Sequence, residues 1–146
     1  MLKITIDQMY GYLADFFESC TWSTGALTEA GNSLIERIAF EQRPETVSVV
    51  RKNKTYDSGR VVEALLDVLN TLVNSHNVAH CLNFAPLLPL IPDFDQEKTD
   101  YILYILACTG DPQYEALIRR ETARFPELNP EEYLSELRGR AGGRQD

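Results

Sequence analysis

The residues best suited to chemistry form a short run of two histidines and a cysteine. His76 and His80 are four positions apart, as metal-binding histidines on a helix often are, and Cys81 follows directly. A zinc site needs three or four ligands, but a metalloprotease glutamate would fall at Asn77 and the nearest acids are distant. A nucleophilic Cys81 would need an oriented base, whereas adjacent helical residues point about 100° apart. We therefore expect solvated or hydrogen-bonded histidines at a helix end, with no metal and no thiol nucleophile.

A second candidate is an acidic run, namely Asp93, Asp95, Glu97 and Asp100. An EF-hand calcium loop needs a glycine at its sixth position and a glutamate at its twelfth. Counted from Asp93, those positions hold a lysine and a tyrosine, so the calcium motif fails. A carboxylate acid–base pair would need a substrate pocket or an oxyanion hole, and nothing nearby in the sequence supplies one. Asp93 or Asp95 as a helix N-cap, with Glu97 in the first turn, explains each acid singly. We predict no catalytic residue and no cofactor.

Charge is distributed very unevenly along the chain. Residues 61–115 hold eight acids and one base, which is −7 of the chain's net −8, and residues 51–54 just before them are basic. A surplus of carboxylates argues against nucleic acid and against an anionic membrane surface, because both attract cations. It favours a basic protein partner, since opposite fields speed encounter.

Apolar residues recur with a helical period almost throughout, which predicts an all-α protein without a sheet. We expect one domain over residues 1–138, with about seven to eight helices, and a flexible polar tail over residues 139–146. The expected helices cover residues 5–20, 24–42, 44–51, 59–75, 77–85, 96–109, 112–125 and 130–138.

Within these helices several residues have expected roles. Helix 5–20 has one apolar face, made of Ile6, Met9, Tyr10, Leu13, Phe16 and Phe17. We expect Trp22 to anchor packing, Gly31 to mark a bend or a close contact, and Gly110 to close a helix. The arginines 119, 120 and 124 are typical of a solvated helix face, and the three cysteines are expected to be reduced and mostly buried.

Two polar stripes interrupt the apolar pattern. In helix 59–75 the polar residues are Glu63, Asp67, Asn70 and Asn74, which fall on one narrow line. In helix 96–109 a second line carries Glu97, Tyr101 and Tyr104, whose tyrosines either bind a partner or pack in the core. In stacked helices the two stripes would lie side by side. The predicted partner-binding residues are Glu63, Asp67, Asn70, Asp93, Asp95, Glu97, Asp100, Tyr101 and Tyr104.

The order of these segments resembles HEAT-like α-helical repeats. The stretch Leu87-Leu88-Pro89-Leu90 precedes Asp93-Phe94-Asp95, a helix, Gly110-Asp111-Pro112 and a second helix, and the resemblance covers residues 59–125. It implies antiparallel helix pairs stacked in a short solenoid or bundle, with atypical end helices acting as caps.

Size, acidity and helical character are also similar to those of bacterial immunity proteins for contact-dependent or polymorphic toxins. That likeness implies a cytoplasmic inhibitor without enzymatic activity, bound tightly to a basic cognate toxin domain that is often a nuclease. A HEAT-like adaptor in a larger assembly is the alternative, and a small enzyme using His76, His80 or the acidic run is the third hypothesis. We expect no small-molecule ligand, no signal peptide and no membrane span.

Overall fold

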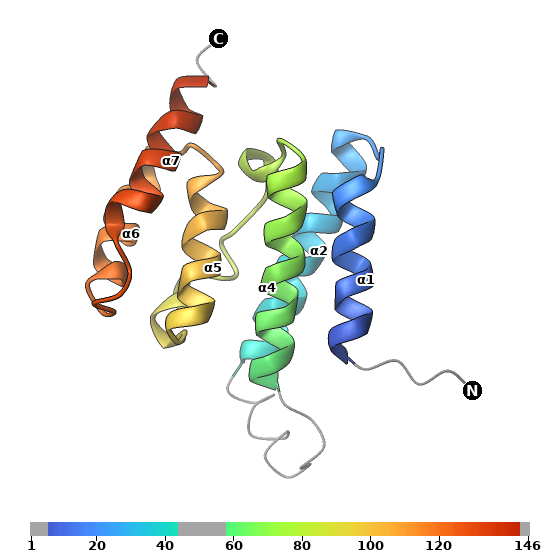
Figure 1. Ribbon diagram of the computed structural model, residues 1–146, viewed down its shortest axis with the longest axis horizontal. Helices are drawn as coiled ribbons and strands as arrows, with labels where there is room; N and C mark the ends of the chain where they lie inside the picture. The colour runs from blue at the N-terminus through green and yellow to red at the C-terminus, as the bar shows by residue number, and fades with distance from the viewer. Residues whose placement is uncertain (1–5, 44–57, 144–146) are drawn as a thin grey trace.

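Helices account for the regular structure of this protein, as the apolar periodicity predicts. The computed structural model describes residues 6–43 and 58–143 (Figure 1). The α-helices are α1 (Ile6–Ser19), α2 (Thr24–Gln42), α4 (Ser58–Ser75), α5 (Gln96–Ala107), α6 (Glu115–Thr122) and α7 (Pro130–Gly143). Short 3-10 helices are η1 (Ala79–Cys81), η2 (Leu88–Asp93) and η3 (Pro112–Tyr114). The expected helix 44–51 and the basic stretch 51–54 lie outside the described residues.

The helices form two layers, and α4 lies at the centre. Figure 1 shows α1, α4, α5 and α7 in a row, with α2 behind α1 and α4 and with α6 behind α7. Val62, Leu66, Leu69 and Leu72 of α4 are fully buried, because both layers cover this helix. A helix that is apolar over most of its circumference must have neighbours on several sides. This central position leaves only the polar stripe of α4 to face outwards.

Side-chain caps begin the helices where the sequence predicts them. Ser23 accepts a hydrogen bond from the Ala26 amide (3.2 Å) at the start of α2. Asp95 accepts one from the Lys98 amide (3.0 Å) at the start of α5. A capping oxygen satisfies one of the amides that the first turn leaves without a partner, which stabilises a helix by about 1 kcal/mol. These starts place the acids of α5 in a defined register.

Two glycines permit close contacts between elements. Gly110 has a φ of +67°, and a Cβ there would lie 2.8 Å from the Ala141 amide nitrogen of α7. At Gly31 a Cβ would lie 2.7 Å from the end of the Leu82 side chain, so this glycine allows close packing rather than a bend. At Gly110 glycine adopts the left-handed conformation at low cost, and at both positions the missing Cβ leaves the space that the contact needs.

The segment between α4 and α5 differs from the prediction. Residues 77–85 do not form an α-helix: the only helical turn there is η1, and the backbone continues as turns. The Asn83 amide donates to the side chain of Asn32 in α2 (2.8 Å), a contact that replaces a helical hydrogen bond. The proline-rich connection that follows forms η2. Residues 77–93 are therefore a compact connection of turns and short 3-10 helices rather than a long helix.

Helix ends near the C-terminus also differ from those expected. α7 continues to Gly143, beyond the expected end at residue 138, and Arg140 pairs with Glu136 (2.7 Å) in this extension. The helix expected over 112–125 is divided into η3 and the shorter α6. The expected tail therefore contains helix up to Gly143.

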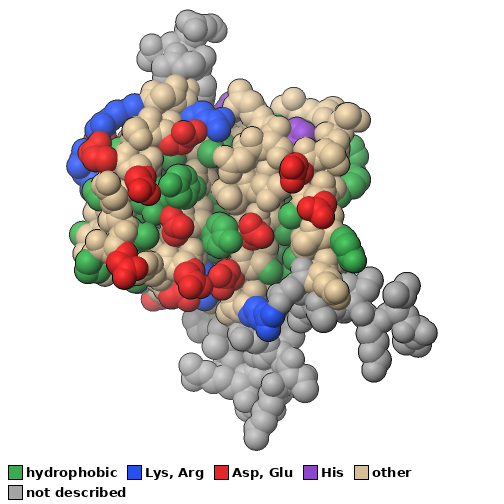
Figure 2. Space-filling view, viewed as in Figure 1, with side chains coloured by type: hydrophobic (Ala, Val, Ile, Leu, Met, Phe, Trp, Pro, Cys, Tyr) green, Lys and Arg blue, Asp and Glu red, His purple; other side chains and the backbone are tan. Residues whose placement is uncertain are grey.

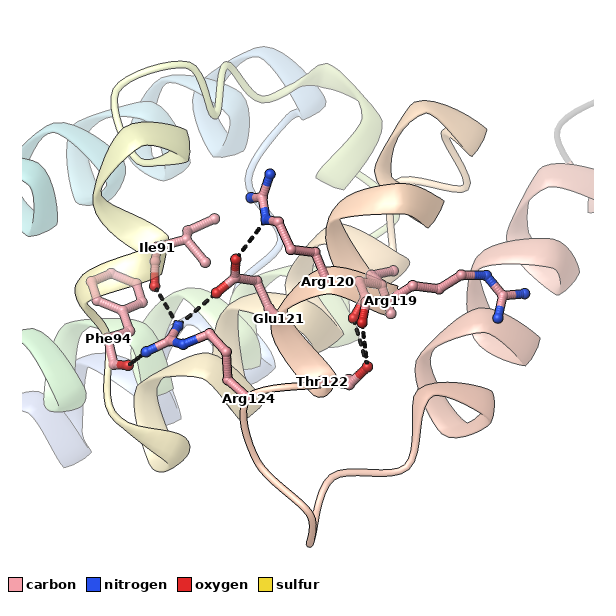
Figure 3. Close-up of polar contacts among 8 residues, drawn as sticks. Ile91, Phe94, Arg119, Arg120, Glu121, Thr122 and Arg124 are labelled. Carbon is pink, nitrogen blue, oxygen red and sulfur yellow. Dashed lines mark hydrogen bonds and ion pairs between the residues drawn. The ribbon is translucent and has the colours of Figure 1, made fainter.

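α6 is held to the rest of the molecule by a buried carboxylate, which corrects the expectation of an ordinary solvated face. Glu121 is 1 % exposed and pairs with Arg120 (2.8 Å) and Arg124 (2.6 Å), as Figure 3 shows. Arg124 also donates to the carbonyl oxygens of Phe94 (2.9 Å) and Ile91 (3.4 Å). These carbonyls end η2, so the network joins α6 to the turn that precedes α5.

α1 has a different buried face from the one predicted. Phe17 is 5 % exposed and belongs to the core, whereas Met9 and Phe16 are exposed. Trp22 is 47 % exposed and contacts Phe16 edge to face, so it is not a buried packing anchor. The predicted apolar face was too wide, because α1 lies at the end of its layer and packs mainly against α4.

Candidate protein-binding surface

The two predicted stripes meet across α4 and α5. Burial raises the pKa of Glu63, and a hydrogen bond with Glu97, the charge of Glu97 and that of Asp95 raise it further. These carboxylates disfavour the ionised form of Glu63, which requires them to lie close to it. Because α4 and α5 pack against each other, their two stripes lie side by side.

Tyr101 lies among the acids of both helices. Burial raises the pKa of its hydroxyl, and the negative charges of Asp67, Glu63, Asp100 and Glu97, in that order, raise it further. Its ring packs against the hydrophobic core, so the residue is half-buried. Tyr101 therefore combines the two interpretations of the tyrosine stripe: its ring supports α5, and its polar end lies among the acids.

α7 extends this group with residues that the sequence analysis did not include. The Tyr104 hydroxyl donates to Glu132 (3.3 Å), and the Tyr133 hydroxyl donates to Asp100 (2.6 Å). The ring centroids of Tyr104 and Tyr133 are 4.7 Å apart. Glu132 and Glu136 are four residues apart, a spacing that already predicts two acids on one side of α7. The position of α7 beside α5 comes only from the fold.

We call the combined surface of α4, α5 and α7 the acidic face. Its members are Glu63, Asp67, Asp95, Glu97, Asp100, Tyr101, Tyr104 and Glu132. Figure 2 shows acidic side chains spread across this side of the molecule, with Lys and Arg mainly towards its edges. Lys98 pairs with Asp95 (3.3 Å), and Arg138 of α7 pairs with Glu115 (3.1 Å) and Glu131 (3.5 Å). Within residues 6–43 and 58–143, no ion pair involves Glu63, Asp67, Glu97 or Asp100.

A groove of about 330 Å³ borders the acidic face between α1, α4 and α5. Its lining residues are Tyr10, Gly11, Arg60, Glu63, Ala64, Asp67 and Tyr101. A Cβ at Gly11 would have no atom within 4 Å, so the α1 side of the groove is open. The groove is a concave site with two acids, two tyrosines and one arginine in its wall, a composition that suits a polar side chain of a partner.

Two predicted residues lie less centrally. The Asn74 amide donates to both the carbonyl and the side-chain oxygen of Asn70 (2.8 Å each), so Asn70 is engaged within α4. Asp93 is exposed in η2, and in the described part of the chain no hydrogen bond or ion pair connects it to the acidic face. Asp93 is therefore not brought into this group.

The histidine run does not form a catalytic arrangement. His76 follows the end of α4, and His80 lies in η1, so the two are not on one helix. His76 Nε2 lies 2.7 Å from the Phe17 carbonyl oxygen and 3.7 Å from Cys20 Sγ. Because a carbonyl only accepts, Nε2 carries a hydrogen and cannot take a proton from the Cys20 thiol. The histidine therefore connects the ends of α1 and α4.

The remaining candidates for chemistry are separate. His80 lines a small cavity of about 140 Å³ with Asp111 and Tyr114, and Cys81 is exposed, contrary to the expectation of mostly buried thiols. Cys20, Cys81 and Cys108 are free thiols. Among the described residues, no three potential metal ligands come close enough together to hold an ion. The described helices also include none with the length and hydrophobicity needed to cross a bilayer.

Comparison with known proteins identifies no relative. No protein-family model, no curated protein and no solved structure matches this chain.

Proposed function

We propose that this protein is a non-enzymatic inhibitor of the immunity type, which neutralises a basic toxin domain by binding it through the acidic face. The carboxylates would occupy the positions that substrate phosphates take on the toxin if the toxin is a nuclease. The acidic face would then cover the toxin's substrate-binding surface, and no reaction of the inhibitor itself is involved.

The observation that carries this proposal is a concentration of carboxylates that outnumber the bases near them, which are Lys98 and Arg60. Glu63, Asp67, Glu97 and Asp100 influence Tyr101 together, although they come from two helices. Burial raises the pKa of Glu63, and the nearby Glu97 and Asp95 raise it further, so negative charge at Glu63 has a cost in the free protein. A cationic partner lowers that cost on binding, so its positive charge is favoured at this surface.

The central experiment is co-purification with the toxin domain encoded directly upstream. The variant Asp67→Lys/Glu97→Lys changes the charge of the acidic face by four units and leaves the Asp95 cap and the Asp100–Tyr133 hydrogen bond in place. We expect it to weaken the complex at least about 100-fold, because like charges across an interface cost several kcal/mol. Calorimetric titration measures the loss.

The matched control is Glu29→Lys/Glu36→Lys, which makes the same charge change at two exposed acids of α2. We expect this control to bind within about threefold of the unmodified protein. Equal losses in the two variants would mean that net charge, not the acidic face, governs binding. Absence of any complex, together with a housekeeping gene neighbourhood, would favour the adaptor hypothesis instead.

A further inference from the structure

The outer side of α1 carries an apolar strip that the core does not use. Met9, Tyr12 and Phe16 follow one another at helical spacing and are 51 %, 62 % and 44 % exposed. Trp22, after the end of α1, contacts Phe16 with a ring-centroid distance of 5.2 Å. We call these four residues the α1 strip.

The α1 strip is at the open end of a helical layer. α1 packs against α4, and among the described residues Figure 1 shows no helix on the other side of α1. Figure 2 shows hydrophobic side chains at this edge beside acidic ones. Exposed residues of this size, three of them aromatic and gathered in one place, are typical of protein interaction sites.

Charge decides what kind of partner suits the α1 strip. Asp15 and Glu18 are exposed on α1, and the segment Ile6–Ser19 contains no lysine or arginine. Glu63 and Asp67 line the groove on the other side of this helix. Pairing α1 with a second copy of itself would bring like charges together around an apolar contact, so charge complementarity favours a basic partner.

We propose that the α1 strip docks an amphipathic α-helix of the partner, whose apolar side chains are flanked by lysines or arginines. This deepens the proposed function, and it rests on that function for the positive charge of the partner. The distance along α1 from Met9 to Phe16 is about 10 Å at 1.5 Å per residue. A partner helix with apolar residues at i, i+3 or i+4, and i+7 matches this length, with its basic residues beside Asp15 and Glu18.

The single tryptophan makes the proposal directly measurable, because Trp22 belongs to the α1 strip. The probe is a synthetic helix of about 18 residues, or five turns, made of leucine and lysine with leucines on one face. Docking transfers the indole from water to apolar contact, so we expect a saturable shift of its emission to shorter wavelength. A peptide with glutamate in place of lysine, and one with the leucine–lysine order scrambled, should each bind at least about tenfold more weakly.

Two variants test the contact itself. Tyr12→Ser and Phe16→Ser each remove an exposed ring, so folding should be retained, and circular dichroism checks this. We expect each to weaken the leucine–lysine peptide at least about tenfold, as at an interface hot spot. The control is Phe40→Ser, because Phe40 is equally exposed (46 %) but lies beneath Arg37 and Arg43, which repel a basic helix. It should change binding by less than about twofold.

Three results would overturn the proposal. The first is the absence of an emission shift with the leucine–lysine peptide, and the second is that Phe16→Ser binds this peptide as tightly as the unmodified protein does. The third is an emission shift that depends on protein concentration and not on the peptide. The third, with a dimer in sedimentation, would assign the α1 strip to a second copy of the chain. The upstream toxin domain separates this inference from the proposed function: a complex that survives Tyr12→Ser and Phe16→Ser but not Asp67→Lys/Glu97→Lys refutes only the α1 strip. No toxin complex despite tight peptide binding refutes only the inhibitor function.

Discussion

Glu63 and Tyr101 on the acidic face respond to the negative charge of the acids around them. Glu63 is influenced most by burial and by Glu97, and both raise its pKa. A carboxyl with a pKa raised by folding binds more protons in the folded than in the unfolded state, so acidification from neutral pH towards its unfolded pKa increases stability. The same group favours a cationic partner when ionised, so the affinity for that partner decreases over the same pH range.

Replacing Glu63 with glutamine tests this linkage. Glu63→Gln should be at least as stable as the unmodified protein at pH 7 and should gain less stability between pH 7 and pH 5. Urea denaturation at both pH values measures the difference. Glu29→Gln, which removes one exposed charge from α2, is the control, and an identical pH response in Glu63→Gln and the unmodified protein would contradict the prediction.

Gly110 is the residue whose backbone the fold depends on most directly. Gly110→Ala should lower the free energy of unfolding by about 2–4 kcal/mol, because a Cβ disfavours a φ of +67° and would also contact the backbone of α7. Urea denaturation provides the measurement. Gly139→Ala is the matched control in α7: its Cβ meets open space, and we expect a gain of up to about 1 kcal/mol.

At the scale of elements, the end of α6 is held by electrostatics in a way that the local pattern does not reveal. The arginines around Glu121 are partly exposed, but the carboxylate itself is buried at 1 % exposure. Because Arg124 also binds the carbonyls that end η2, this network positions α6 and the start of α5 together. The positions of the acids of α5 therefore depend indirectly on the Glu121–Arg124 network.

Removal of the buried carboxylate should therefore affect stability strongly. We expect Glu121→Ala to cost about 2–4 kcal/mol and Arg124→Ala less, about 1–2 kcal/mol, because a lost partner leaves buried polar groups without compensation. A double-mutant cycle should give a coupling of at least about 1 kcal/mol. The exposed pair Glu115–Arg138 is the reference, and Glu115→Ala should cost less than about 1 kcal/mol. Additive effects of the two replacements would show that the ion pair contributes nothing of its own.

For the whole molecule, a net charge of −8 is combined with an uneven distribution of acids and bases over the surface. The acids spread over α4, α5 and α7, whereas Arg138 and Arg140, each paired with an acid, lie on α7 at one end of the layer. A field of this kind mainly accelerates encounter with an oppositely charged partner.

The association rate with the basic toxin domain should consequently depend on salt. We expect it to fall at least about tenfold between about 0.02 and 0.5 M salt, since screening shortens the reach of exposed charges. Stopped-flow fluorescence of Trp22 measures the rate. The Asp67→Lys/Glu97→Lys variant should show a flatter salt dependence, and the same slope in both proteins would contradict electrostatic steering by the acidic face.

Sequence patterns alone were sufficient for the all-α class, for the start of a helix near residue 24, for Asp93 or Asp95 as the cap of the next acidic helix, and for the glycine at the end of α5. These features depend on local periods, on caps and on backbone conformation, which neighbouring residues specify. The same patterns also placed Glu63, Asp67 and Asn70 on one side of α4, because helical spacing alone sets that relation.

The packing of the helices, which the sequence patterns do not contain, sets which polar stripes meet and which apolar residues remain exposed. Glu132 joined the acidic face, and the buried Tyr133 binds Asp100, because α7 packs beside α5, a contact between distant segments that no local pattern contains. Phe16 and Phe17 are adjacent and equally apolar, yet only Phe17 is buried. Burial depends on the number of neighbouring helices, and among the helices of residues 6–43 and 58–143, α1 has a neighbour in its layer on one side only.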